Sequence, residues 1–211
     1  MKITQEQLKQ ALLERYTSEM YEKISNASVA IAGLGGLGSN VAVMLARAGV
    51  GHLLLADFDT VEITNLNRQA YTCEHLGKKK TEALSEILKD INPYIQLEVK
   101  DCYVTQENAA ELFGAYPIVC EAFDKAENKA ILVNTILERQ KETVVVSGLG
   151  MAGYGSSNEI HTKKIMKRLY VCGDRKTEVD RDVCLMASRV TVCAAHQANM
   201  IIRLILGITE V

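Results

Sequence analysis

Two short stretches of the chain carry residue types that could bind a polyphosphate together. Residues 33–38 are rich in glycine, and residues 65–69 begin 27 positions after this turn ends. Glycines let backbone N–H groups approach a phosphate, and the helix expected after the turn adds free N–H groups and a positive dipole. The second stretch adds the cation Arg68 and the carboxamides of Asn65 and Gln69. Because a dehydrogenase has no obvious use for them, the two stretches favour binding and attack of a triphosphate.

The glycine turn matches the pattern G-x-G-x-x-G. In this pattern the first glycine permits a tight turn, the second lets the backbone reach phosphate, and the third lets helix and strand pack closely. Asp57 ends the next apolar run, where a carboxylate can accept hydrogen bonds from a ribose hydroxyl. These features also suit a NAD-binding domain, so a NAD(P)-dependent oxidoreductase stays open. The candidate nucleotide-binding glycines are Gly33, Gly35, Gly36 and Gly38.

Further charged residues could complete a site for phosphate chemistry. In-line attack at an α-phosphate develops negative charge, which Arg68 and Lys80 could neutralise. Asp124 follows another apolar run and could hold a Mg²⁺ ion that bridges phosphates and stabilises departing pyrophosphate. Structural alternatives exist: Lys80 ends a run of three lysines typical of a solvated helix start, and Asp124 could cap the following helix. Asp59 could form a turn, and Asn65 could also be a cap.

The pattern of apolar runs predicts the elements that position these residues. An apolar run over 29–32, the glycine turn, a helix over 40–48 and a second apolar run over 52–56 form a β-turn-α-β unit. Strands and helices then alternate as far as residue 147, which predicts a Rossmann-like α/β fold with a mainly parallel, doubly wound sheet. The expected later helices are 78–90, 106–114 and 127–141, and the expected later strands are 95–100, 117–123 and 143–147.

The two ends of the chain follow other patterns. Apolar residues every fourth position over 4–24 predict an amphipathic helix that packs on its own domain or across a partner subunit. Residues 148–157 contain four glycines and predict a loop, and residues 158–183 predict a short hairpin and a mobile crossover segment. An apolar helix is expected over 187–206. We expect one domain over 1–211, divided into 1–27 (N-terminal helix), 28–148 (nucleotide-binding core), 149–186 (loop and crossover segment) and 187–211 (C-terminal helix).

Composition narrows the class of protein. With 211 residues, 48% of them hydrophobic, the chain can bury one core. A net charge of −2 does not favour a nucleic-acid partner or an anionic membrane surface. No apolar run reaches the roughly 18 residues of a membrane span, and no leader is seen, so we expect a cytoplasmic protein without membrane contact. The six cysteines form no C-x-x-C pair, which predicts reduced thiols, most of them buried.

One long motif resembles the signature of a known family. Residues 57–69 read D-F-D-T-V-E-I-T-N-L-N-R-Q. Together with the glycine turn, Lys80 and Asp124, this motif resembles the ubiquitin-activating superfamily, specifically its bacterial branch of ThiF, MoeB and HesA-like adenylyltransferases. Those proteins carry G-x-G-G-L-G, then D-x-D-x-V-x-x-S-N-L-x-R-Q, then a lysine and a strand-end aspartate. Here Thr64 replaces the usual serine, and the match spans roughly residues 29–148.

The resemblance implies an enzyme that uses ATP and Mg²⁺ to adenylate the C-terminal carboxylate of a small ubiquitin-like sulfur carrier. The carrier would end in Gly-Gly, pyrophosphate would be released, and the compact ThiF-like form suggests thiamine thiazole synthesis and a homodimer. The carboxylate is itself the nucleophile, so catalysis needs positioning and charge neutralisation rather than a general base. By resemblance Asp57 binds the ribose and Asp124 the magnesium. The remaining ATP-binding residues implied are Asp59, Asn65, Arg68, Gln69 and Lys80.

The chain departs from the family pattern in three places. Relatives carry R-Y-x-R-Q in the N-terminal helix, and its second arginine reaches the partner subunit's ATP; here Arg15 and Tyr16 fit, but Ser18 stands at the position of that arginine. Many relatives bind zinc through two C-x-x-C pairs, which this chain lacks, so we expect no zinc. Cys184 lies near the segment where some relatives carry a reactive cysteine, but we expect it to be a buried structural residue.

Other functions stay open beside the carrier adenylyltransferase. The same chemistry could act on a molybdopterin-type carrier or on a small carboxylate, as in a tRNA-modifying relative. Ser18 suggests a non-catalytic ATP-binding scaffold, and the glycine turn with Asp57 permits the oxidoreductase. For the carrier hypothesis, residues 148–157 and the segment after them are expected to cover the carrier's tail.

Overall fold

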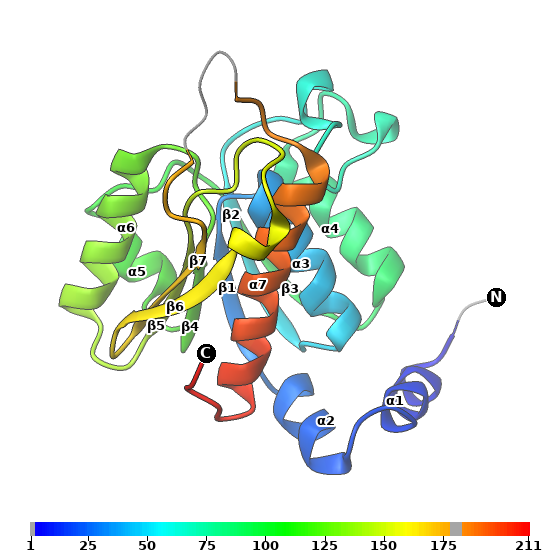
Figure 1. The fold of residues 1–211 in the computed structure, drawn as a ribbon. Helices are drawn as coiled ribbons and strands as arrows, with labels where there is room; N and C mark the ends of the chain where they lie inside the picture. Colours follow the sequence, from blue (N-terminus) through cyan, green and yellow to red (C-terminus); the bar gives the residue numbers. More distant parts are fainter. Residues whose placement is uncertain (1–2, 178–182) are drawn as a thin grey trace.

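The computed structural model describes residues 3–177 and 183–211. Its strands form one seven-stranded sheet in the order β3-β2-β1-β4-β5-β7-β6. Every neighbouring pair is parallel except β6 with β7. Helices α3, α4 and α7 cover one face of the sheet, and α5 and α6 cover the other (Figure 1). The predicted α/β fold with a doubly wound, mainly parallel sheet is therefore confirmed.

The elements have the following bounds. The strands are β1 (Ser28–Ala32), β2 (His52–Asp57), β3 (Gln96–Asp101), β4 (Ile118–Glu121), β5 (Val144–Gly148), β6 (His161–Met166) and β7 (Leu169–Gly173). The helices are α1 (Gln5–Leu13), α2 (Ser18–Ser25), α3 (Gly36–Ala48), α4 (Lys80–Ile91), α5 (Ala109–Phe113), α6 (Ala126–Arg139) and α7 (Ala187–Ile205). Three short 3₁₀ turns are η1 (Ile63–Asn65), η2 (Cys73–His75) and η3 (Ser157–Glu159).

The strands between the two outer strands β3 and β6 are buried on both faces, which explains their continuous apolar runs. In β1, Val29 and Ile31 join the core beneath α3, α4 and α7, while Ala30 and Ala32 join the core beneath α5 and α6. This alternation follows from the two-residue period of a strand. Gln197 of α7 is fully buried and its side-chain N–H donates to the carbonyls of two neighbouring strands, at 3.0 Å in β4 and 3.2 Å in β5. The bonds fix α7 against the centre of the sheet.

Close packing explains the third glycine of the turn. A Cβ atom at Gly38 would collide with the carbonyl oxygen of Gly33, so only glycine lets α3 begin directly above the end of β1. Gly33 itself has a φ of +89°, which L side chains rarely adopt. Gly49, with the same φ, ends α3 in the left-handed conformation common at helix C-termini.

The N-terminal region differs from the predicted single helix over 4–24. It forms two helices, because Thr17 starts a new one by accepting a hydrogen bond at its Oγ1 from the Met20 N–H, at 3.2 Å. Helix α1 contains no buried residue. Figure 1 shows α1 and α2 at the end of the molecule where β1 begins.

The segment after β5 contains the predicted hairpin. Strands β6 and β7 pair antiparallel, and β7 adds in parallel to β5. Part of the predicted mobile crossover, residues 178–182, lies outside the described residues. Over the part of the chain that is described, no helix is long and apolar enough to cross a membrane.

Candidate functional site

A cavity of about 680 Å³ opens at the carboxyl ends of the central strands. Ligand sites of open α/β sheets lie at this edge, where the strand order reverses. In this sheet the chain runs from β1 through β2 to β3 on one side, and then crosses from β3 to β4 on the other side of β1. The sequence-predicted residues that line the cavity are Gly33, Gly35, Gly36, Asp57, Asp59, Asn65, Arg68, Gln69, Lys80 and Asp124. Gly38 lies instead in the packing of α3.

Backbone hydrogen bonds hold Asp57 in place at the end of β2. Its Oδ2 accepts from the Leu34 N–H at 2.6 Å, and its Oδ1 accepts from the Asp59 N–H at 2.8 Å. The Tyr71 hydroxyl donates to the Leu34 carbonyl at 2.8 Å, and burial, helped by Asp57 and Asp59, raises the pKa of this phenol. The carboxylate is thus fixed beside the glycine turn, with lone pairs left for a hydroxyl in the cavity.

Residues 65–69 form a short turn whose polar side chains bond the neighbouring backbone and line the cavity. Asn65 Oδ1 accepts from the Glu62 N–H at 3.0 Å, so Asn65 completes a capping box whose N-cap is Glu62, and it also lines the cavity. Arg68 donates to the Thr64 carbonyl at 3.0 Å and makes no ion pair with any described residue. Gln69 Oε1 is buried with no hydrogen-bond partner among the described residues. The turn therefore places one cation in the cavity lining and, within the described part of the chain, keeps one unpaired acceptor buried beside it.

Three consecutive lysines have three different environments. Lys78 pairs with Glu86 at 2.6 Å and Lys79 with Asp101 at 3.3 Å, and both side chains are about 40% exposed. Lys80 pairs with Asp59 at 2.7 Å, and its side chain is only 7% exposed. The solvated helix start considered for this run fits the first two lysines and is wrong for Lys80. Only the third lysine places its ammonium group in the cavity wall.

Asp124 follows β4 and is exposed at the cavity. The next helix, α6, has Lys125 at its N-cap position with no side-chain capping bond, so the proposed capping role of Asp124 is wrong. A single carboxylate is a suitable protein ligand for Mg²⁺, which keeps several waters and binds substrate phosphates besides one or two carboxylates. Among the described residues no group of three His, Cys, Asp or Glu side chains could hold a metal.

A further ion pair, with a fully buried carboxylate, lies beside these residues and was missed in the sequence. Glu121 is fully buried at the end of β4, and Lys129 contacts both of its carboxylate oxygens at 3.0 Å. Ser147 donates to the same carboxylate at 2.6 Å, and Lys129 also donates to the Gly148 carbonyl at 2.8 Å. Lys129 lines the cavity. A charged residue within the apolar run 118–122 was the available signal.

A comparison with protein families decides the kinship of this chain. The model of the ThiF family matches residues 8–211. The chain belongs to the ThiF family.

Curated relatives of this ThiF-family chain differ in what they act on. The tRNA threonylcarbamoyladenosine dehydratase of Haemophilus influenzae is 33% identical over 156 residues, which is 73% of this chain and 59% of the relative. The molybdopterin-synthase adenylyltransferase of the same organism is 38% identical over 120 residues, 56% of this chain and 49% of that protein. The chain therefore spans about half to three fifths of the length of these relatives.

Solved structures show the same ThiF-type fold over almost the whole chain. The E. coli tRNA N6-threonylcarbamoyladenosine dehydratase TcdA in complex with ATP has a TM-score of 0.87, with 98% of both chains covered at 20% identity. E. coli MccB with ATP has a TM-score of 0.69 and covers 91% of this chain and 59% of that one at 24% identity. At these identities the likeness concerns the fold alone.

The cysteines of this ThiF-family chain differ in exposure. Cys184 is exposed, so the expectation of a buried structural residue is wrong. Its carbonyl accepts from the Gly153 N–H at 2.7 Å, which places residue 184 beside the glycine-rich loop. Burial raises the pKa of Cys172 to about 11 and that of Cys193 to about 12. These two thiols are protonated at neutral pH and are poor nucleophiles.

The family's N-terminal arginine position lies far from this cavity. Arg15 and Ser18 are both exposed in the region of α1 and α2. That region lies at the end of the molecule where β1 begins, whereas the cavity lies where β1 ends (Figure 1). Neither residue lines the cavity of its own chain.

Proposed function

We propose that this chain activates a carboxylate by adenylation with ATP. A carboxylate oxygen attacks the α-phosphorus, the bond from that phosphorus to the bridging oxygen breaks, and pyrophosphate leaves while an acyl-adenylate forms. The observation that carries this proposal is one cavity that joins the N-terminus of α3, Arg68, Lys80 and Asp124. These residues suit a triphosphate, which carries several negative charges and develops more charge during the reaction. We treat residues 1–211 as one adenylyltransferase domain.

Different lining residues bind different parts of ATP. The glycine turn takes the phosphates and Asp57 the ribose, with its orientation set by the Leu34 and Asp59 N–H groups. Arg68 and Lys80 neutralise phosphate charge, and Asn65 and Gln69 hold phosphate oxygens or coordinated water. Asp59 keeps the Lys80 ammonium aimed at the cavity through their 2.7 Å contact.

Asp124 would hold Mg²⁺ in this site. The ion, when bound, supplies bridging of phosphate oxygens and stabilisation of the leaving pyrophosphate. The exposed position of Asp124 and its lack of a capping role leave the carboxylate free for such a bond. We propose no zinc site for this chain.

The proposed substrate is the Gly-Gly carboxylate of a small ubiquitin-like sulfur carrier, with thiamine thiazole synthesis as the pathway. We expect an extended tail without side chains to reach the α-phosphate, because it needs the least room beside the bound nucleotide. The relatives include the molybdopterin-synthase adenylyltransferase, so a molybdopterin-type carrier is the nearest variant. The free cysteines suit a reducing compartment, the cytoplasm.

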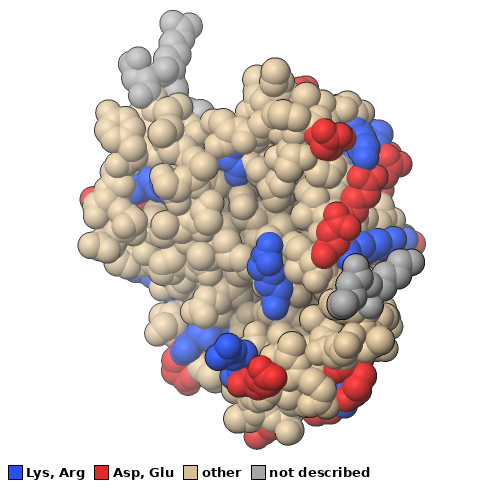
Figure 2. Space-filling model, turned by 90° about the vertical axis from the view of Figure 1, so that its right-hand side faces the viewer, with Lys and Arg blue, Asp and Glu red and all other residues tan. Residues whose placement is uncertain are grey.

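A second substrate class is favoured by a different observation. The relative matched over the most residues of those described above is a tRNA threonylcarbamoyladenosine dehydratase. A carboxylate carried on RNA is therefore the alternative. On the face in Figure 2, lysines and arginines are scattered among acidic and uncharged side chains and form no continuous basic area. That face suits a protein carrier better than an RNA backbone.

A homodimer is the proposed assembly. Helix α1 contains no buried residue although it carries Leu8, Leu12 and Leu13. A partner subunit that covers α1 would bury these leucines and could bring a cation to the site in place of the arginine missing at Ser18.

The test is exchange of labelled pyrophosphate into ATP by the whole chain. We expect exchange that depends on Mg²⁺ and on a Gly-Gly-ended carrier and that vanishes when the final glycine is deleted. Exchange with a threonylcarbamoyladenosine-containing tRNA and not with a carrier would select the second substrate class. ATP binding without exchange for any carboxylate would identify a non-catalytic scaffold, and stabilisation by NADH but not by Mg-ATP would refute the proposal in favour of an oxidoreductase.

A further inference from the structure

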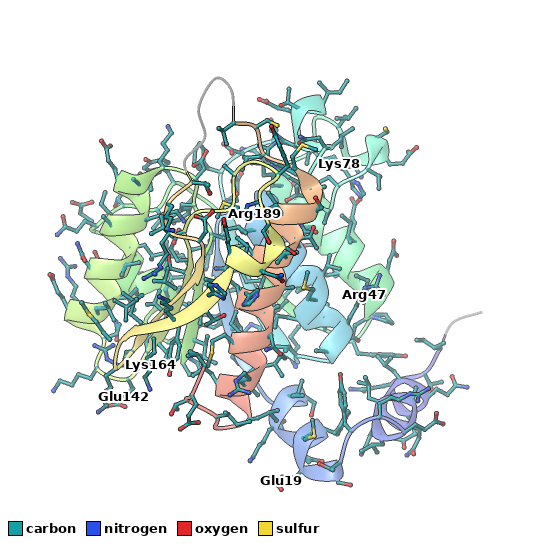
Figure 3. The ribbon with its side chains drawn as sticks, in the orientation of Figure 1. Glu19, Arg47, Lys78, Glu142, Lys164 and Arg189 are labelled. Carbon is teal, nitrogen blue, oxygen red and sulfur yellow. The ribbon has the colours of Figure 1, made fainter. Side chains whose placement is uncertain are left out.

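A buried ion pair stands at the start of α7, outside the set of residues that bind phosphate. Arg189 Nη2 lies 2.6 Å from Asp174 Oδ2, and both side chains are 3% exposed. Figure 3 shows Arg189 where α7 begins, among the loops above the sheet. A cation in the first turn opposes the helix dipole, and a buried charge is costly unless paired. The stability of α7 therefore does not account for this arginine.

The pair joins two segments that are distant in the sequence. Arg189 Nη1 donates to the carbonyls of Gly155 and Ser156, both at 2.6 Å. Asp174 accepts from the N–H groups of Lys176 and Thr177, at 2.8 and 2.9 Å. One arginine side chain thus fastens the glycine-rich loop to the turn that follows β7.

Gly150 of this loop allows close packing against the pair. Gly150 has a φ of +80°, and a Cβ atom there would collide with the carboxylate of Asp174. The Gly150 carbonyl accepts from the Asp174 N–H at 2.9 Å, and the Leu149 carbonyl accepts from the Arg175 N–H at 3.0 Å. Ala152 in the same loop is only 2% exposed. This part of the loop is therefore a packed wall, whereas residues 154–157 are exposed.

This wall borders the cavity on the side away from Asp57, the carboxylate proposed to bind the ribose. Its residues at the cavity are Leu149, Gly150, Met151, Ala152 and Thr177. The sheet order places β5, which leads into the wall, three strands from β2, which ends at Asp57. At strand spacings of about 4.8 Å, the two ends lie about 14 Å apart. A nucleotide anchored at β2 leaves the wall free for the second reactant.

We propose that Arg189 and Asp174 are positioning residues that set the affinity for the carboxylate substrate. Their ion pair holds residues 149–152 in the one place where an extended tail can lie between the wall and the α-phosphate. This inference rests on the proposed adenylation and adds the residues that select and align the acyl half of the reaction. Neither residue touches the substrate.

The test compares Arg189→Met with the matched variant Arg168→Met. Arg168 also donates to two carbonyls, those of Thr143 at 2.9 Å and Leu137 at 2.7 Å. It lies at the amino ends of β5 and β7, whereas the cavity lies at the carboxyl ends of the strands. In carrier-dependent pyrophosphate exchange, we expect Arg189→Met to raise the KM for the carrier by about tenfold or more and to leave the Kd for Mg-ATP within about twofold of wild type. Arg168→Met should change neither quantity. An equal rise in the ATP Kd, or no rise in the carrier KM, would overturn the proposal.

A second readout separates this inference from the proposed function. Amide hydrogen exchange of residues 150–157 needs no turnover and no carrier. We expect faster exchange there in Arg189→Met, recovered in part by Arg189→Lys, and unchanged exchange in Arg168→Met. Unchanged protection in Arg189→Met would refute the proposal that Arg189 holds this loop in place, even in an active enzyme. If the wild-type protein shows no pyrophosphate exchange, the proposed function is refuted, whatever the amide hydrogen exchange shows. The positioning role of Arg189 and Asp174 is then refuted as well.

Discussion

The two sides of the cavity hold their charged side chains in opposite ways. On the β2 side, Arg68 and Lys80 lie in the cavity lining, where the backbone or a single carboxylate holds them. On the β5 and β7 side, Arg189 and Asp174 are buried against each other, and residues 149–152 present backbone and apolar side chains to the cavity. The ammonium group of Lys129, on the same side, is neutralised by the buried Glu121. One side is thus built to bind charge and the other to fit a shape. The contrast suggests that the nucleotide and the acyl substrate are recognised by separate walls.

The largest effect is expected from the cation on the charge-binding side. Lys80→Met should lower the rate of pyrophosphate exchange by about 10² to 10³, because it removes a cation from charge developing in the transition state. Asp59, the partner left behind, is 47% exposed in its side chain, so water replaces the lost contact and the fold should hold. Lys79→Met is the control, since this lysine pairs with Asp101 at the surface. Equal rates for the two variants would remove Lys80 from the site.

Two glycines of the same turn should respond in different ways. Gly38→Ala should lower the free energy of unfolding by about 3 kcal/mol, because its Cβ would meet the Gly33 carbonyl. A Cβ at Gly35 would lie 3.8 Å from the Gln69 side chain, so Gly35→Ala should fold normally and weaken ATP binding. Urea unfolding and calorimetric titration with Mg-ATP measure the two effects. Reversed results would mean that the roles of the two glycines are exchanged.

The buried pair of the shape-fitting side should show in stability and its pH dependence. Burial raises the pKa of Asp174, but hydrogen bonds from Thr177, Lys176 and Arg189 lower it by a larger amount. The net pKa is therefore below its usual 3.8. The stabilisation is therefore fully present above about pH 4 and is lost as the pH falls through the lowered pKa. Asp174→Asn should cost about 3 kcal/mol at pH 7, as expected for breaking a buried pair.

Urea unfolding of wild type and Asp174→Asn from pH 7 downward measures that difference. We expect it to be constant to about pH 4 and to shrink only below it. A difference that already fades between pH 7 and pH 5 would assign the effect to another group.

The smallest effect is expected at Cys184. This residue is exposed beside the shape-fitting wall and does not line the cavity. Cys184→Ser should leave pyrophosphate exchange unchanged, because adenylation needs no thiol. A loss of exchange in this variant would show that the residue contributes to structure or substrate binding.

The charge-binding side could be predicted because its residues lie close together in the sequence. The glycine turn and residues 57–69 form local motifs whose spacing already implies a shared edge of the sheet. The alternating strands and helices likewise follow from local periodicity. The break at Thr17 was missed because a single capping bond decides it, while the apolar spacing of four residues continues across it.

The shape-fitting side depends on contacts between distant residues, which the sequence does not reveal. Arg189 meets Gly155 across 34 positions and Asp174 across 15. The four glycines of residues 148–157 therefore predicted only a loop, whereas two of them, Gly150 and Gly155, lie against this pair. Glu121 and Lys129 were missed for a similar reason, since their partner Ser147 comes from the next strand.

The most direct test of the central claim follows the oxygen of the substrate. A Gly-Gly-ended carrier with ¹⁸O in its terminal carboxylate is incubated with Mg-ATP and the protein, and the acyl-adenylate is then hydrolysed at its acyl carbon. If the carboxylate attacks the α-phosphorus, one labelled oxygen appears in AMP, and Asp124→Ala abolishes its appearance. Unlabelled AMP, or label in inorganic phosphate released with ADP, would contradict adenylation in this cavity.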